Sequence, residues 1–124
     1  MGESLSKIPI RITIVGKGEA TGILNRLTAP LTVEEILKRL PINTRTSPAV
    51  GFVSILIDLK RGVEKPVSRV QAGTIGYWPR GDALCIYIKD TAPYGQVNRV
   101  GEIQEGLELF QGLRSGSRII IERV

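Results

Sequence analysis

The chain has 124 residues, of which 42% are hydrophobic and 23% charged, and this size predicts a single domain over residues 1–124. Histidine is absent and Cys85 is the only cysteine, which excludes histidine-ligated zinc, internal disulfides and nucleophiles activated by histidine. The formal net charge of +5 is compatible with an acidic ligand or a nucleic acid, although acidic residues are interspersed with the basic ones.

The N-terminal half predicts a β-hairpin followed by a short helix. We expect residues 1–7 to be a flexible N-terminus. Residues 8–14 alternate isoleucine with other residues, which is typical of a half-buried strand, and residues 20–27 return after a glycine-rich turn. The segment Thr32–Glu35 matches a capping box, so it predicts the start of a helix that ends at Pro41. Residues 41–49 are expected to form a loop.

The C-terminal half predicts several short strands and a second helix. Apolar residues at near-helical spacing over 103–113 favour that helix, although Gly106 and Gly112 weaken it. A long polar loop is expected over residues 89–98. The expected strands cover residues 50–59, 66–72, 74–78, 83–88, 99–103 and 118–124. About eight short strands and two short helices predict a mainly β fold, a closed or nearly closed barrel capped by the helices.

The sequence carries no segment of the kind that targets a protein to a membrane. The N-terminus lacks an apolar signal region, and no run of about 18 apolar residues occurs. We therefore expect a cytoplasmic protein with no membrane partner. Nothing in the composition calls for a metal or another cofactor, and the oligomeric state stays open.

Two motifs have simpler structural interpretations. Gly16, Gly18 and Gly22 imitate a dinucleotide-binding fingerprint, but the third glycine comes one residue late and no βαβ unit follows. We interpret them as hairpin glycines. Cys85 lies among apolar residues without a histidine to activate it, which predicts a buried and unreactive thiol.

The run Tyr77-Trp78-Pro79 is the densest aromatic point of a chain that is only 5% aromatic. A tryptophan beside a proline turn favours a plug that closes one end of the barrel. The alternative is a binding platform, since Trp and Tyr give a large contact area at low entropic cost.

The run from Gly76 to Cys85, Gly-Tyr-Trp-Pro-Arg-Gly-Asp-Ala-Leu-Cys, resembles the signature of a family of small microbial cyclophilin-like domains whose function is not established. The helix that ends at Leu40-Pro41, the Asn43-Thr44 pair after it and the stretch Asn98–Leu107 match as well. The resemblance extends from about Ile10 to Val124. It implies an eight-stranded cyclophilin-like barrel with helices that cap its two ends.

Cyclophilins isomerise X-Pro bonds in a groove built from an arginine, a glutamine, several aromatic residues and a histidine. This chain has no histidine, and residues 45–52 lack the family's arginine motif. We therefore expect a domain that binds a peptide or small ligand in a cleft without efficient catalysis. One alternative is a divergent peptidyl-prolyl isomerase in which Arg45 or Arg99 stands in as the donor, and another is a basic nucleic-acid-binding barrel. The candidate lining consists of Arg45, Phe52, Tyr77, Trp78, Tyr94, Gln96 and Arg99.

Overall fold

The alternating isoleucines at the N-terminal end form strand β1 (Lys7–Ile14), in which every second side chain is buried. The computed structural model describes residues 6–93 and 95–124, and Lys7 already belongs to this strand instead of a flexible terminus. The other strands are β2 (Gly18–Asn25), β3 (Ile42–Ala49), β4 (Phe52–Leu56), β5 (Thr74–Trp78), β6 (Ala83–Tyr87), β7 (Asn98–Glu105) and β8 (Arg118–Arg123).

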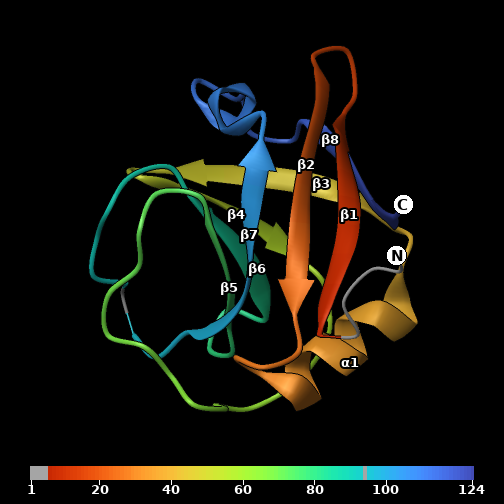
Figure 1. The fold of residues 1–124 in the computed structure, drawn as a ribbon. Coiled ribbons are helices and arrows are strands. Elements are labelled where there is room, and N and C mark those ends of the chain that lie inside the picture. Colours follow the sequence, from red (N-terminus) through yellow and green to blue (C-terminus); the bar gives the residue numbers. More distant parts are fainter. Residues whose placement is uncertain (1–5, 94) are drawn as a thin grey trace.

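The eight strands close into one antiparallel barrel, as the sequence predicts (Figure 1). Around the barrel, neighbours follow the order β1-β2-β7-β5-β6-β4-β3-β8. A large apolar cluster fills the interior, and it includes Val53, Ile55, Ile57 and Leu59, which alternate along the segment predicted as a strand over residues 50–59. No helix among the described residues is long and apolar enough to cross a membrane.

Helix α1 (Pro30–Arg39) covers one end of the barrel, but it begins before the predicted capping box. No side chain caps it from the adjacent residue Ala29. Instead the carboxylate of Glu64, from a distant loop, accepts hydrogen bonds from the backbone N–H groups of Leu31 (2.9 Å) and Thr32 (2.8 Å). The prediction of a local cap is therefore wrong, because a long-range acceptor satisfies the N–H groups at this helix end.

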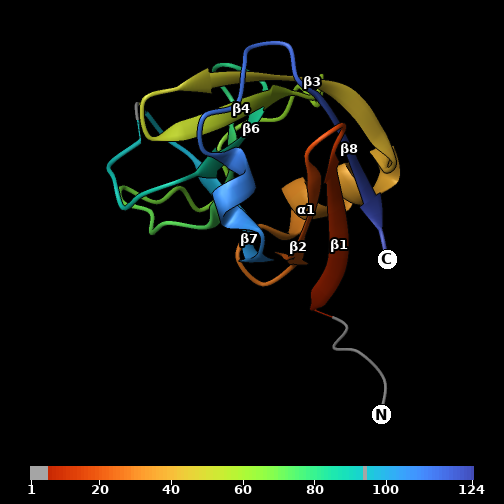
Figure 2. The same cartoon turned by 90° about the horizontal axis from the view of Figure 1, so that it is seen from above.

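Strand β3 replaces the loop that was expected over residues 41–49 (Figure 2). Its first half pairs with β8 and its second half, residues 46–49, pairs with β4. The backbone N–H of Thr46 points towards the β8 side and donates to the Ser117 carbonyl. Two residues further on, the nitrogen of Pro48 points to the same side, where β8 has already ended and offers no acceptor. Pro48 thus breaks no ladder hydrogen bond, since it stands on a free strand edge.

The second predicted helix is reduced to a single 3-10 turn, η1 (Leu107–Phe110), at the barrel end opposite α1 (Figure 1). Strand β7 runs on to Glu105, and Gly106 then adopts a left-handed φ of 93°. A Cβ at this glycine would lie 2.8 Å from the Cα of Ala20. The close approach of two backbone segments requires glycine here, and its left-handed conformation ends the strand. Only a 3-10 turn follows, so the expectation of two capping helices is half right.

The long connection from residue 57 to residue 73 contains no strand, although one was predicted over residues 66–72. It is fastened to the loop after β6 by two isolated bridges, Val67 with Val97 and Val70 with Thr91. These two loops therefore lie side by side on the outer surface of the barrel, over β5 and β6.

Candidate ligand-binding site

A second, smaller apolar cluster lies outside the barrel. It forms because successive side chains of strand β6 point to opposite faces of the sheet. Leu84 and Ile86 point into the barrel, so Cys85 and Tyr87 point outwards. On the neighbouring strand, Gly76 stands opposite Cys85, and a Cβ there would lie only 2.4 Å from Cγ1 of Val97. The missing side chain of Gly76 lets Val97 pack directly over the sheet.

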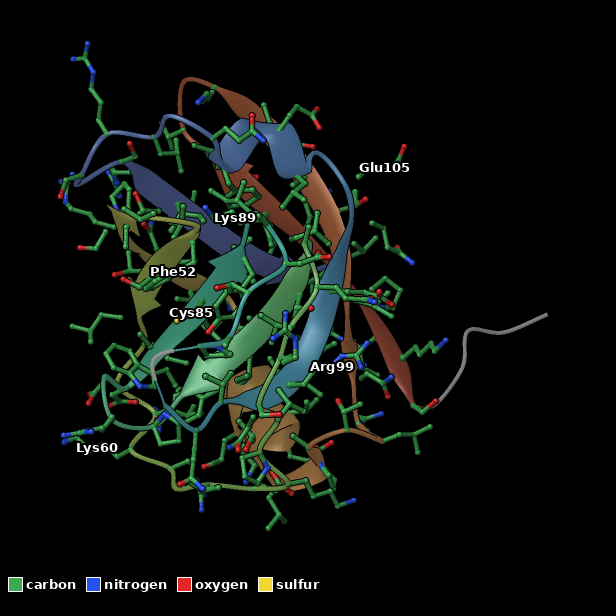
Figure 3. All side chains as sticks on the ribbon, turned by 90° about the vertical axis from the view of Figure 1, so that its left-hand side faces the viewer. Phe52, Lys60, Cys85, Lys89, Arg99 and Glu105 are labelled. Atoms are coloured by element: carbon green, nitrogen blue, oxygen red, sulfur yellow. The ribbon has the colours of Figure 1, made fainter. Side chains whose placement is uncertain are left out.

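This outer cluster surrounds a cavity of about 210 Å³. The rings of Phe52 and Tyr87 form one wall, with centroids 5.7 Å apart and planes tilted by 38°. Figure 3 shows this face, with Phe52, Cys85 and Lys89 on neighbouring parts of it. The lining residues are Val50, Phe52, Trp78, Cys85, Tyr87, Lys89, Thr91, Ala92, Pro93 and Val97.

Trp78 belongs to the wall of this cavity and not to the barrel interior. Its ring lies against Gly81, where an added Cβ would come within 2.4 Å of the ring carbons, and its Nε1 lies beside Gly95. The Nε1 atom is buried and has no hydrogen-bond partner among residues 6–93 and 95–124. Trp78 therefore packs on the outer cluster and does not plug the barrel interior. Its role as a binding platform stays a prediction.

The thiol of Cys85 lies in the cavity lining but is poorly suited to nucleophilic chemistry. Burial raises the pKa of this thiol to about 11, and contact with the Tyr87 hydroxyl lowers it only in part. Burial also raises the pKa of Tyr87. Both groups are therefore neutral near pH 7, and the reactive thiolate form of Cys85 is scarce.

Of the six predicted site residues that the structure describes, it brings together two in this cavity, Phe52 and Trp78. Arg45 lies on the outer face of β3, where its Nη1 donates to the Gly116 carbonyl at 2.9 Å. Arg99 lines a different hollow, and Gln96 lines a third. Tyr94 lies outside the described residues.

Tyr77 points the opposite way from Trp78 and is completely buried in the barrel core. Its hydroxyl donates to Oδ1 of Asp82 at 2.6 Å and accepts the backbone N–H of Arg61 at 3.1 Å. The same Asp82 oxygen accepts the N–H groups of Leu59 (2.8 Å) and Lys60 (2.9 Å). Tyr77 therefore joins the turn after Trp78 to the start of the long connection, and it is not part of the cavity.

Sequence reasoning missed Tyr87, Cys85 and Val97 as lining residues. A signal was present for the first two, because the strand predicted over residues 83–88 alternates, and its outward positions must share one face. Val97 could not be found in this way, since it reaches the site through the bridge to Val67. No metal-binding group of three or more Asp, Glu or Cys side chains occurs within the described part of the chain.

The comparison with protein families matches residues 8–122 to the model described as cyclophilin-like. The chain belongs to the cyclophilin-like family. Among solved structures, the hypothetical protein AF2241 from Archaeoglobus fulgidus is similar over 100% of both chains, with 25% identity and a TM-score of 0.80. A structure of McbB in complex with tryptophan is similar over 92% of this chain and 44% of the other, with 17% identity and a TM-score of 0.74. No curated protein matches the sequence.

Proposed function

We propose that this cyclophilin-like domain binds a peptide or small ligand by holding an apolar group in the cavity between Phe52, Trp78 and Tyr87. The observation that carries the proposal is a space of about 210 Å³ between aromatic rings that the protein's own described side chains leave unfilled. An apolar cavity of roughly 150 Å³ accommodates benzene, so a proline or aromatic ring is of suitable size. Aromatic walls supply a large contact area at low entropic cost.

The charge at the cavity indicates which ligands suit it best. Lys89 is the one charged residue in the described part of the lining, and its side chain is exposed at the surface. The buried Nε1–H of Trp78 adds a donor without an acceptor among the described residues. A ligand that carries a carboxylate or carbonyl beside its ring would satisfy both groups.

The cavity is less well suited to catalysis of prolyl isomerisation. That reaction is accelerated by a donor that meets the twisted amide as it loses resonance. The ten lining residues include no arginine, while Arg45 and Arg99 are placed elsewhere. This arrangement supports binding without efficient turnover over a divergent isomerase.

The binding proposal is tested with Trp78 fluorescence, because Trp78 is the only tryptophan of the chain. The probes are proline-containing tetrapeptides, phenylpropionate and L-tryptophan, the last because McbB was solved with it. We expect a saturable change for at least one of these probes. A matched pair of variants locates the site: Phe52→Ala removes one wall, whereas Leu56→Ala changes an exposed residue of the same strand outside the lining.

Phe52→Ala is expected to weaken binding about tenfold or more, as the loss of a buried aromatic contact does, and Leu56→Ala to leave it unchanged. Equal binding by both variants, or no saturation with any of the three probe classes, contradicts the proposal. A nucleic-acid interface, the remaining alternative, requires oligonucleotide binding that falls steeply with salt and is indifferent to Phe52→Ala.

A further inference from the structure

A second hollow, of about 430 Å³, lies on the other side of the bridged loops and has a different chemistry. Val67 and Val70, whose bridges to Val97 and Thr91 fasten these loops together, form its boundary with the outer apolar cluster. Its lining is mostly polar: Val67, Arg69, Val70, Gln71, Thr74, Asp90 and Arg99. Figure 3 shows Arg99 on the same face of the molecule as the aromatic cavity, at some distance from Phe52.

Two arginines line this hollow, and neither has an ion pair with another residue that the structure describes. Arg69 comes from the long connection and Arg99 from β7, and both side chains are exposed. Neither forms a salt bridge with any described residue, whereas Arg11 pairs with Glu122 and Arg61 pairs with Glu35. Two unpaired guanidiniums on one hollow create a positive potential that an anion would neutralise.

The acidic groups nearby do not neutralise these arginines. Asp90 is the one acid among the described lining residues, and its Oδ1 accepts the backbone N–H of Ala72 at 2.8 Å, which holds it in place. Glu102 lines a separate small crevice together with Arg99, and no ion pair joins the two. The lining therefore keeps a formal charge of +1, from two arginines and one aspartate.

Thr74 adds a further hydrogen-bond donor to the lining of the hollow. It begins β5 and is only 5% exposed, with the adjacent Ile75 inside the barrel and the Thr74 side chain at the hollow. Its backbone N–H is bonded to the Gln71 carbonyl, but its hydroxyl has no hydrogen bond to any residue within 6–93 and 95–124. Trp78 Nε1 is the one fully buried side-chain polar atom without a partner among the described residues, so the Thr74 hydroxyl still reaches the surface of the hollow. There it can donate to an oxygen-rich anion that the two guanidiniums bind.

We propose that this hollow is a binding site for the phosphate monoester group of a small ligand. Arg69 and Arg99 would each donate to phosphate oxygens, since the planar guanidinium matches phosphate geometry, and the Thr74 hydroxyl would donate a further hydrogen bond. Two cations favour a dianionic monoester over the singly charged diester of a nucleic-acid backbone. The hollow is larger than a phosphate ion, so a hydroxylated organic part fits beside the Asp90 carboxylate, an acceptor for hydroxyl groups.

The test is a titration of the full chain with inorganic phosphate and with glucose 6-phosphate, followed by amide chemical shifts at constant ionic strength. We expect saturable shifts at Gln71, Thr74 and Arg99, with tighter binding of the sugar phosphate. Arg69→Gln and Arg99→Gln should each weaken binding about tenfold, and Thr74→Val several-fold, as lost hydrogen bonds to a charged group do. Arg114→Gln removes the same charge from an exposed position outside the hollow and should change nothing.

Equal weakening by Arg114→Gln and Arg99→Gln would show a non-specific charge effect and overturn the proposal. Absence of saturation, or shifts confined to other surfaces, would overturn it as well. If a single-stranded oligonucleotide binds more tightly than either phosphate probe, the hollow is a nucleic-acid site and the proposal of a small phosphorylated ligand is overturned. Failure here is distinguishable from failure of the proposed function, because the aromatic cavity is tested with different probes and with Phe52→Ala.

Discussion

Removal of the Asp82 carboxylate should destabilise the protein strongly, because one oxygen of this residue serves three donors. These donors are the backbone N–H groups of Leu59 and Lys60 and the hydroxyl of Tyr77. Water can replace the acceptor at the exposed Lys60, but the buried N–H of Leu59 would lose its acceptor, and the buried Tyr77 hydroxyl would keep only the Arg61 carbonyl at 3.5 Å. At roughly 1–3 kcal/mol for each buried donor left unpaired, Asp82→Ala should lower the free energy of unfolding by about 3 kcal/mol.

Asp82→Asn separates the charge from the hydrogen bonds, since an amide oxygen still accepts from the same donors. We expect Asp82→Asn to lower the free energy of unfolding by about 1 kcal/mol, which is the difference between a charged and a neutral hydrogen-bond acceptor. Burial raises the pKa of Asp82, but hydrogen bonds from Tyr77, Lys60 and Leu59 outweigh it, so the pKa is lowered on folding. A lowered pKa stabilises the folded state above the unfolded pKa of about 3.9, and this contribution is lost as the pH falls through the folded pKa.

The assay is urea unfolding followed by circular dichroism and Trp78 fluorescence at pH 7 and at pH values below 4. The difference in the free energy of unfolding between wild type and Asp82→Asn should be constant above about pH 5 and should shrink below pH 4. Asp58→Ala is the control, because Asp58 lies in the same connection but is exposed, with only a surface ion pair to Lys60. If Asp82→Ala and Asp58→Ala unfold at the same urea concentration, the reasoning about this network is refuted.

Three further predictions concern the helix, the thiol and the activity. Glu64→Ala should lower the free energy of unfolding by about 1–2 kcal/mol in the same urea assay, because α1 loses its acceptor for two N–H groups. An unchanged unfolding midpoint would contradict this. Cys85 should resist alkylation at pH 8 until the protein is unfolded, since its pKa is raised to about 11, and rapid labelling of the folded protein would show that the thiol is accessible. Isomerisation of prolyl tetrapeptides should be absent or orders of magnitude below that of cyclophilins, and efficient turnover that is lost in Arg45→Gln or Arg99→Gln would prove the opposite.

Much of the fold could be predicted because the local pattern and the tertiary structure agree. The alternation over residues 8–14 predicts β1, and the alternation from Val53 to Leu59 identifies core residues even where no strand forms. The errors occur where distant segments decide the structure. Pro48 is tolerated in β3 because β8 has already ended, and the start of α1 is held by Glu64, more than thirty positions away.

The candidate site was harder to predict than the fold, because the loops over β5 and β6 assemble it. The aromatic run at 77–79 points to the right region, but alternation places Tyr77 inside and Trp78 outside. The sequence places Arg45 and Arg99 in one site with the aromatic residues only because it gives no distances across a barrel. The structure instead places Arg45 beside Gly116 and Arg99 in the polar hollow.

The most direct test of the ligand-binding account is a set of intermolecular nuclear Overhauser effects with the tightest of the three probes. The indole N–H of Trp78 gives a single resonance and marks the cavity, because the chain has one tryptophan. The account predicts contacts from the ring of the probe to Phe52, Trp78 and Tyr87, and their loss in Phe52→Ala. Contacts confined to another surface, such as that around Arg45 on β3, would contradict the assignment of the aromatic cavity as the binding site.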